Sequence, residues 1–496
     1  MTTSELSSTS AQNLPTVGPF TMFRLGLFNL GLGLMAVLTL AVLNRVMISE
    51  LDIPATVTAG ALAVPQFMAP ARIWFGQLSD SKKIFKLHRS GYVWIGTVLF
   101  GSAIFVAVQI VWQLALAVRE NGGWAWSGEM LLWAIALGAV LGFYGLALSS
   151  TSTPFTALLV DISDENNRSK IVAVVWSMLL LGVVIGGISG SIFLDQVQQA
   201  GVILGANAGA IITQGEKLLN TPIESLQGPI NSLFLVVPAI AFGLGLLGIL
   251  GIERKYSRFS RRTAPTTRED QITFQDSIKV VRSSPQTAIF FSFLVTFTIS
   301  LFMQEAVLEP YGGEVFGMSI GESTLLNSYW GIGVLVGYSV TGFLVVPRLG
   351  KKNTARLGCL LTAACFFLII LAGFTQQPQI LRYALVLFGM ATGIGTIGAI
   401  SLMLDLTAAE TAGTFIGTWA LAQAMSRAIA TLMGGVVLDI GRAIFQTPLL
   451  AYSSVFVLQA VGMFSAIFIL NNVNIHEFKE NTRQAIATIL EGELDG

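Results

Sequence analysis

Long runs of apolar residues, separated by short polar segments, dominate this sequence. The stretches 25–43, 94–118 and 451–470 are each about 20 residues or longer, the length of helix that crosses a hydrocarbon layer about 30 Å thick. Charged residues make up 11% of the chain, whereas soluble globular proteins carry about 25%. A chain this poor in charge cannot cover itself with a water-compatible surface. The sequence therefore predicts an all-α membrane protein.

About twelve such spans can be placed along the chain. Each is expected to be a helix, because hydrocarbon offers backbone N–H and C=O groups no partner outside the segment itself. We predict spans at about 23–47, 55–79, 91–118, 130–159, 167–195, 231–252, 286–309, 322–347, 355–375, 380–404, 412–440 and 450–471.

The spans divide into two groups of six around a long polar stretch. We predict a disordered cytoplasmic tail over 1–20, a six-helix bundle over 21–252, a cytoplasmic linker over 253–285, a second six-helix bundle over 286–472 and a cytoplasmic tail over 473–496. The linker is rich in Arg, and either an interfacial amphipathic helix or a solvated charged loop accounts for its composition. The segment 196–229 is predicted as the longest loop on the opposite side.

The basic residues between the spans predict the orientation of the chain. They gather in every second loop, as Lys82, Lys83, Arg254, Lys351 and Lys352 illustrate, and are sparse in the loops between. Loops rich in Lys and Arg stay on the cytoplasmic side of a membrane. We therefore expect both termini to be cytoplasmic.

The two halves of the chain repeat one another. The same spacing separates Asp161 from Asp405 and Asp195 from Asp439. Each pair begins with a polar turn and ends at the close of the next predicted span. Repeated six-helix halves are typical of the major facilitator fold, so we expect two pseudo-symmetric bundles with a substrate site between them.

The loop after the second predicted span carries a recognisable motif. The stretch 76–83 resembles the loop signature of the major facilitator superfamily, Gly-x-Leu-x-Asp followed by basic residues. A glycine allows close helix approach, and an aspartate at a helix end can pair with a cation or a facing helix N-terminus. An ordinary charged turn is the alternative. The predicted cytoplasmic gate, which would latch the two halves, consists of Gly76, Asp80, Lys82, Asp161 and Arg168.

A second stripe of glycines marks the fifth predicted span. Gly182, Gly186 and Gly190 recur every four residues, a pattern that lets helices pack closely in membranes. Two other glycine strings match the dinucleotide pattern G-x-G-x-x-G, but they lie inside apolar runs without a strand–turn–helix context. Together with the lack of a P-loop, this argues against a nucleotide site.

Metal and enzymatic chemistry find little support in the residue types. The chain has two cysteines, Cys359 and Cys365, in one apolar run, and two histidines, His88 and His476, in predicted cytoplasmic segments. We expect no metal site, no catalytic residues and no nucleic-acid partner. A tetrapyrrole held in the membrane would have no His as axial ligand and would need an Asn, Gln, Glu, carbonyl or water oxygen.

Polar residues inside the apolar spans are the sharper signal, because ionisable groups at such depth are costly and usually line a cavity or pair with each other. Structural pairing, for example of Arg45 with Glu309, is the alternative to a cargo or proton site. The candidates are Asn44, Arg45, Arg72, Gln304, Glu305, Glu309, Tyr311, Gln423 and Arg427.

Four blocks of sequence resemble a specific branch of this superfamily. They are 44–55, 69–80, 304–319 and 417–424, and they are similar to the PucC-like, bacteriochlorophyll-delivery family. The resemblance implies an inner or photosynthetic (thylakoid or intracytoplasmic) membrane. It also implies (bacterio)chlorophyll as cargo, and membrane lipid, light-harvesting or photosystem polypeptides and pigment-synthesis enzymes as partners.

Two functions remain open from the sequence. The first is an assembly factor that binds chlorophyll or a precursor and delivers it to antenna or photosystem polypeptides. The second is a proton-coupled secondary transporter of a small solute, in which Glu305 or Glu309 exchanges protons, since a desolvated carboxylate can do so. The resemblance favours the first.

Overall fold

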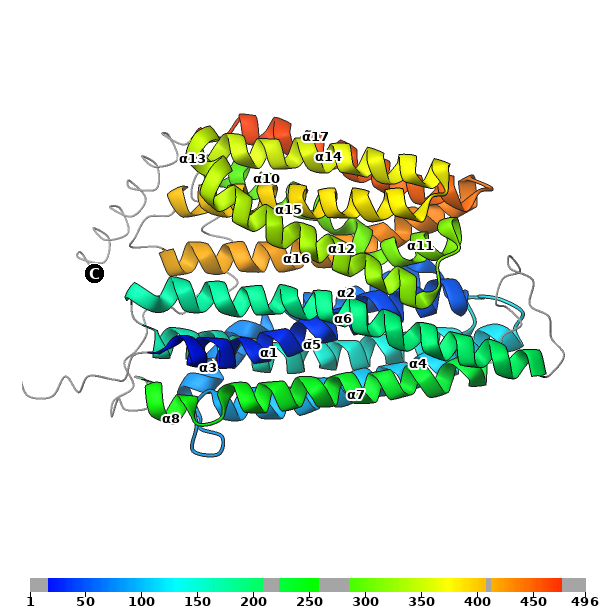
Figure 1. The fold of residues 1–496 in the computed structure, drawn as a ribbon, viewed down its shortest axis with the longest axis horizontal. Helices are drawn as coiled ribbons and strands as arrows, with labels where there is room; N and C mark the ends of the chain where they lie inside the picture. The colour runs from blue at the N-terminus through cyan, green and yellow to red at the C-terminus, as the bar shows by residue number, and fades with distance from the viewer. Residues whose placement is uncertain (1–16, 164, 208–222, 258–284, 407–411, 475–496) are drawn as a thin grey trace, which may run out of the picture.

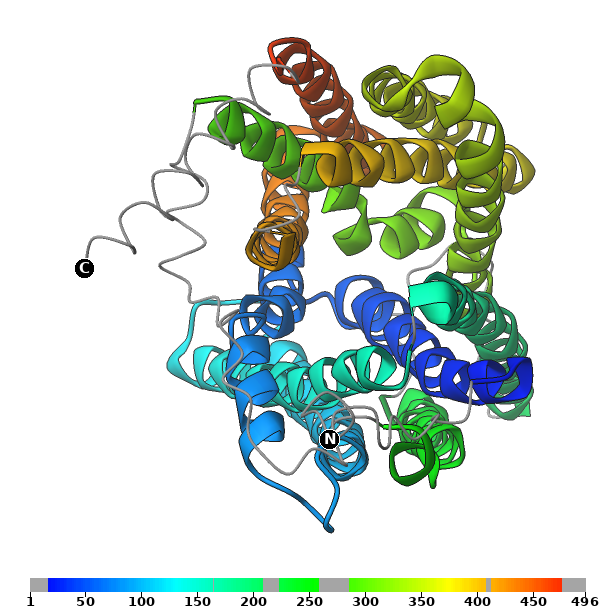
Figure 2. The same ribbon diagram turned by 90° about the vertical axis from the view of Figure 1, so that its left-hand side faces the viewer.

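The structure, a computed structural model, describes residues 17–163, 165–207, 223–257, 285–406 and 412–474. These residues are almost entirely helical, and most of the helices run alongside one another (Figure 1). Seen from one end, the helices of the first half gather below and those of the second half above (Figure 2). The predicted tails 1–20 and 473–496 and the linker 253–285 lie mostly outside the described residues.

The first half builds one bundle. Its elements are α1 (Pro19–Val37), continued by η1 (Leu38–Leu43) and η2 (Val46–Glu50), then α2 (Ala55–Phe67), α3 (Ala71–Ser81), α4 (Ser90–Glu120), α5 (Gly128–Ile162), α6 (Glu165–Asn207), α7 (Ile223–Ile249) and α8 (Ile252–Tyr256). The loop predicted over 196–229 is therefore shorter, because α6 and α7 extend into it.

The second half builds the other bundle. Its elements are α10 (Pro285–Phe302), η5 (Met303–Ala306), α11 (Leu308–Phe316), α12 (Ile320–Val340), η6 (Thr341–Val345), α13 (Val346–Leu349), α14 (Lys351–Thr375), α15 (Pro378–Leu406), α16 (Ala412–Ile444) and α17 (Pro448–Asn471). The span predicted as one helix over 286–309 is broken here at η5 and resumes as α11.

Eleven helices in the described residues are long and apolar enough to cross a membrane. The twelfth predicted span, 55–79, is divided into α2 and α3, of 13 and 11 residues, by a turn over residues 68–70. Pro70 causes the break, because the residue before a proline is disfavoured in helical conformation. The prediction of an all-α membrane protein with the major facilitator architecture is confirmed.

Small residues bring the helices together, as the glycine stripe of α6 predicted. A Cβ at Gly182 would fall on the Leu30 carbonyl oxygen of α1, and one at Gly187 would fall on the Ser328 hydroxyl of α12. The stripe therefore joins α6 both to its own bundle and to the other one.

The bundles meet mainly over one half of their length. Residues 183–190 of α6 lie against 324–331 of α12, and the Ala55 and Ala59 turns of α2 lie against Gly435 of α16. α3, which continues α2, packs instead on α5 of its own bundle. We call the end at which α2 starts the far end.

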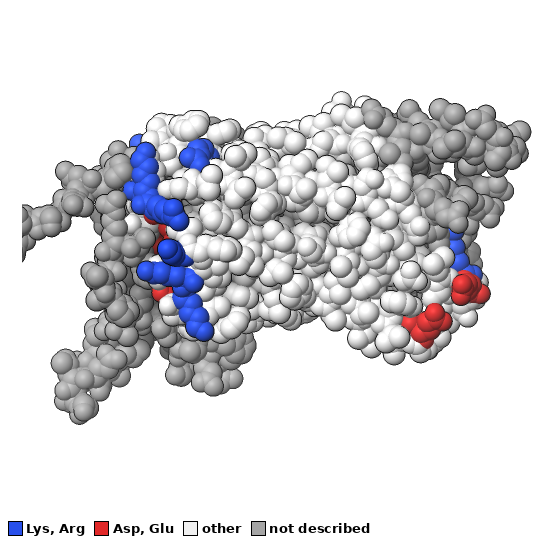
Figure 3. Space-filling model, turned by 90° about the horizontal axis from the view of Figure 1, so that it is seen from below, with Lys and Arg blue, Asp and Glu red and all other residues white. Residues whose placement is uncertain are grey.

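Basic side chains gather at the opposite end of the molecule, which we call the basic end. Its residues include Lys82, Lys83, Arg254, Lys255 and Lys351. Figure 3 shows Lys and Arg clustered at the end where α8 lies, separated from the far end by a surface almost free of charge. An uncharged band between two polar ends is the surface of an integral membrane protein.

We predict that Gly182→Ala destabilises the protein by about 1–3 kcal/mol, because the new methyl group overlaps backbone of α1. Gly243→Ala is the matched control, since its Cβ would meet open space within helix α7. Thermal unfolding in detergent measures both. Equal melting temperatures for the two variants would contradict the close α1–α6 contact.

Candidate functional site

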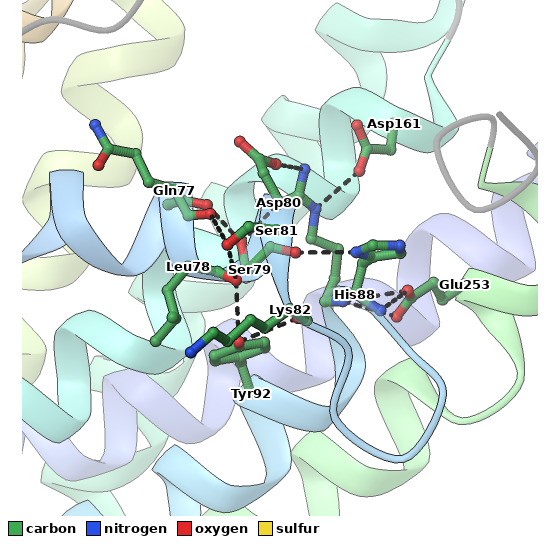
Figure 4. A network of polar contacts seen from close by, with 12 residues as sticks. Gln77, Leu78, Ser79, Asp80, Ser81, Lys82, His88, Tyr92, Asp161 and Glu253 are labelled. Carbon is green, nitrogen blue, oxygen red and sulfur yellow. Dashed lines mark hydrogen bonds and ion pairs between the residues drawn. The ribbon is translucent and has the colours of Figure 1, made fainter. Parts of the chain in front are cut away.

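Arg89 is the centre of a polar network at the basic end (Figure 4). Its side chain is 1% exposed. Its Nη2 lies 2.5 Å from a carboxylate oxygen of Asp80, its Nε donates to Asp161 at 3.0 Å, and its Nη1 donates to the Ser79 hydroxyl at 2.5 Å. One buried cation thus joins α3, α4 and α5.

Glu253 of α8 completes this network from the backbone side. Its carboxylate accepts hydrogen bonds from the backbone N–H groups of His88 (2.6 Å), Arg89 (3.1 Å) and Ser90 (2.7 Å). These groups lie at the start of α4, where N–H groups lack helical partners and the helix dipole favours negative charge. Glu253 therefore fixes the chain that follows α7 to the entrance of α4.

The structure places the predicted gate residues as follows. Asp80 and Asp161 share Arg89, and Gly76 lies beside Thr153 of α5. The Lys82 side chain is exposed, while its carbonyl accepts a hydrogen bond from Tyr92. Arg168 lies in α6, but its side chain is outside the described residues. All the described contacts stay within the first bundle, so a latch between the halves remains a prediction.

The sequence reasoning missed Arg89 and Glu253. The signal was present, because Arg89 directly precedes the 31-residue apolar helix α4 and Glu253 directly follows α7. A charge at such a boundary is usually a solvated residue, and only the tertiary structure places these two against each other.

A second polar cluster surrounds the break between α10 and α11. Pro310 lacks an N–H and its ring would clash with the carbonyl four residues earlier, that of Ala306, so the helix cannot continue. The free carbonyls of Glu305 and Ala306 accept hydrogen bonds from the Asn44 amide, at 3.4 and 3.1 Å. Asn44 belongs to the first bundle, so this bond joins the two halves.

Glu309 lies beside this break, 2% exposed. Its carboxylate accepts hydrogen bonds from Asn327 at 2.7 Å and from Asn44 at 3.4 Å. The suggested Arg45–Glu309 pair is wrong. Arg45 lies 3.1 Å from Glu50 of its own bundle, and its guanidinium occupies the space that a side chain at Gly313 would need. Among the described residues Glu309 has no cationic partner.

Further ion pairs close the far end. Glu314 accepts hydrogen bonds from Arg442 at 2.6 Å and from Ser49, in the other bundle, at 3.3 Å. Asp439 accepts from the first two N–H groups of α2, at 3.1 and 2.7 Å. The sequence singled out Asp439 only as a marker of the repeat, and its role as the cap of a helix in the other half was missed.

Three charged residues lie between the bundles nearer the membrane centre, and we call them the central arginine site: Arg72, Glu305 and Arg427. Both guanidinium nitrogens of Arg427 that face Glu305 bind its carboxylate, and Arg427 also lies 4.7 Å from the centre of the Phe302 ring. Arg72 is exposed. Gln423 lies one helical turn from Arg427 on the same face of α16.

Two predicted candidates are core residues of the second bundle. Gln304 accepts a hydrogen bond from Gln459 at 3.1 Å. Tyr311 is fully buried, donates to the Ile369 carbonyl at 2.9 Å, and packs against Tyr452. Both satisfy their polar groups inside one half, and they support the fold rather than line the interface.

The search for metal ligands covers the described residues alone and finds no group of three or more His, Cys, Asp or Glu side chains that could hold an ion. Cys359 and Cys365 are buried as free thiols. The His88 ring lies at the basic end, with Nδ1 3.2 Å from the Ser79 carbonyl oxygen.

Comparison with known proteins decides the family. The chain matches the PUCC protein family over residues 42–478. It belongs to this family. The PUCC match includes both polar clusters and the central arginine site.

Curated relatives of this PUCC-family chain come from phototrophic bacteria. It is 27% identical to the "Bacteriochlorophyll synthase 44.5 kDa chain" of Rhodobacter capsulatus, over 90% of this chain and 93% of the relative. It is 25% identical to "Protein PucC" of the same species, over 84% and 83%. The corresponding values for "Protein PucC" of Cereibacter sphaeroides are 24%, 90% and 91%.

Solved transporter structures share the fold. The nucleoside transporter NupG superposes with a TM-score of 0.64 at 12% identity, covering 91% of this chain and 98% of NupG. A bacterial homologue of the iron transporter ferroportin, in an inward-facing state, gives 0.62 at 14% identity, covering 92% and 97%. At such identities the likeness concerns the architecture alone.

We predict that Arg89→Gln lowers the free energy of unfolding by about 3–5 kcal/mol, because it leaves the buried Asp161 carboxylate without its cation. Lys83→Gln, an exposed neighbour, is the control. The double variant Arg89→Gln with Asp161→Asn should recover part of the loss. A melting temperature of Arg89→Gln equal to that of the control would show that the network contributes nothing.

Proposed function

We propose that this chain is a carrier, not a catalyst, which binds (bacterio)chlorophyll or a precursor and delivers it to light-harvesting or photosystem polypeptides. The observation that carries the proposal is the 27% identity, over 90% of the chain, to a relative named for bacteriochlorophyll synthesis. A pigment-carrying role places the chain in an inner or photosynthetic membrane, beside the pigment-synthesis enzymes. The distribution of basic residues favours cytoplasmic termini.

One unpartnered oxygen supports a site for magnesium-containing cargo. Gln66 Oε1 is buried and has no hydrogen-bond partner in the described part of the chain. Gln66 is three helical turns from Ala55, and therefore lies on the face of α2 that meets α16. Magnesium prefers oxygen ligands, so this amide oxygen is suited to bind the metal of a chlorophyll between the two bundles.

The pigment prediction has a direct test. The protein, purified in mild detergent from a phototrophic host, should show pigment absorption bands. After pigment removal, Gln66→Leu should bind a magnesium tetrapyrrole about tenfold more weakly, or about 1.4 kcal/mol. Binding of the metal-free analogue should not change.

Gln77→Leu is the matched control, because Gln77 is an exposed glutamine on α3. Fluorescence titration gives both affinities. A protein that carries no pigment, and whose loss leaves antenna assembly intact, would end the proposal. If Gln66→Leu weakens the two analogues equally, pigment binding stands but the metal is held elsewhere.

A proton-coupled transporter is the second candidate, favoured by one observation. The buried Glu309 carboxylate hydrogen-bonds both bundles through Asn327 and Asn44, and has no cation beside it among the described residues. Protonation of this carboxylate would weaken the bond from Asn44 and release the halves. In proteoliposomes this function predicts a flux that depends on a pH gradient.

Glu309→Gln should abolish that flux by at least about tenfold, since the amide cannot exchange protons. Glu322→Gln is the control, because Glu322 is a more exposed carboxylate at the start of α12. Absence of pH-dependent flux in the unaltered protein would reject the transporter.

A further inference from the structure

The charges of the central arginine site do not balance. Arg427 and Glu305 neutralise one another through two hydrogen bonds, which occupy both oxygens of the Glu305 carboxylate. The Arg72 side chain forms no hydrogen bond or ion pair with any described residue. Two guanidinium groups therefore share one carboxylate, and the site keeps a net positive charge.

Arg72 faces the other bundle rather than lipid. α2 and α16 run antiparallel, since Ala55 lies against Gly435 and Gly60 against Leu432. Continued toward the basic end, this register brings the start of α3 beside the turns of α16 that precede Arg427. The positive charges of Arg72 and Arg427 are close enough to repel each other. The Arg72 side chain is exposed in a position that protein surrounds on most sides.

An unpaired arginine at this depth is unusual. Ionisable groups inside a membrane protein pair with one another or line a functional path, because a charge without a counter-charge is costly there. Arg45, Arg89 and Arg442, the other deeply placed arginines described above, each have a carboxylate within 3.1 Å. Arg72 is the exception among them, and a ligand with negative charge would complete it.

Aromatic groups flank the same space. Phe75 lies one turn from Arg72 on the same face of α3, and the Trp74 ring packs edge-on against Phe75 with ring centres 4.8 Å apart. Trp74 is 58% exposed. Across the interface, Phe302 lies under the Arg427 guanidinium. The surroundings of the charge are suited to a large flat apolar body.

We propose that the cargo carries a free carboxylate, which Arg72 binds while the apolar body of the cargo lies between the bundles. The proposal rests on the proposed pigment-carrying function and narrows it. Chlorophylls have their propionate esterified with a long alcohol, whereas their immediate precursors keep it as a free acid. The preferred cargo is thus the tetrapyrrole before esterification, and the reaction that consumes it is an esterification.

A pair of probes isolates the carboxylate. Chlorophyllide a and its methyl ester have the same magnesium and the same ring and differ only in that charge. The unaltered protein in detergent should bind the free acid about tenfold more tightly than the ester, because a guanidinium–carboxylate pair away from water is a strong contact. Quenching of protein fluorescence gives both dissociation constants.

Variants of Arg72 test the assignment of the residue. Arg72→Gln should bring the free acid down to the affinity of the ester, with ester binding unchanged, and Arg72→Lys should keep most of the preference. Lys86→Gln, an exposed basic residue outside the site, is the control. If Arg72→Gln does not fold, the acid-to-ester ratio of the unaltered protein and of Arg72→Lys decides instead.

The outcomes separate this inference from the function on which it rests. Equal affinity for acid and ester overturns the carboxylate, while pigment binding stands. If no tetrapyrrole binds, palmitate and methyl palmitate are compared. Arg72-dependent binding of palmitate alone would support a carboxylate site and reject the pigment. Failure of every probe to bind overturns the inference as well.

Discussion

The break between α10 and α11 is the point on which the joining of the two halves depends. Backbone carbonyls without partners are not tolerated away from water. Pro310 frees such carbonyls at Glu305 and Ala306, and the partner that satisfies them, Asn44, comes from the opposite bundle. A defect in one helix thus becomes a bond between the halves, with Glu309 and Asn327 extending it.

Charge pairing follows the same logic at both ends of the molecule. At the basic end Arg89 collects two carboxylates from neighbouring helices of one bundle, which makes α3, α4 and α5 a single unit. At the far end Glu314 and Asp439 reach across to the first bundle. The interface is therefore held by polar contacts at the far end and is weakly bound near the basic end, where Arg72 is left without a partner.

Much of the fold was predictable from the sequence, and much of the site was not. The spans followed from the apolar runs, and Asn44, Glu305, Glu309 and Arg427 were recognised as costly residues inside them. Their pairing was not. Arg45 was expected opposite Glu309 but contacts Glu50, because charges several residues apart on one broken helix can meet when the helix bends. Gln304 and Tyr311 looked equally exceptional, yet they satisfy each polar group inside the core.

The sequence by itself determined the solvent of this protein, its helical class and its two similar halves. These properties depend on residue type summed over long stretches, and hydrocarbon leaves a chain of this composition few alternatives. Only the tertiary structure decided which charges are neutralised and which are not. That outcome depends on a few ångströms between helices distant in sequence, so Arg427 could be identified in advance as important, but Arg72 could not be identified as the one without a carboxylate.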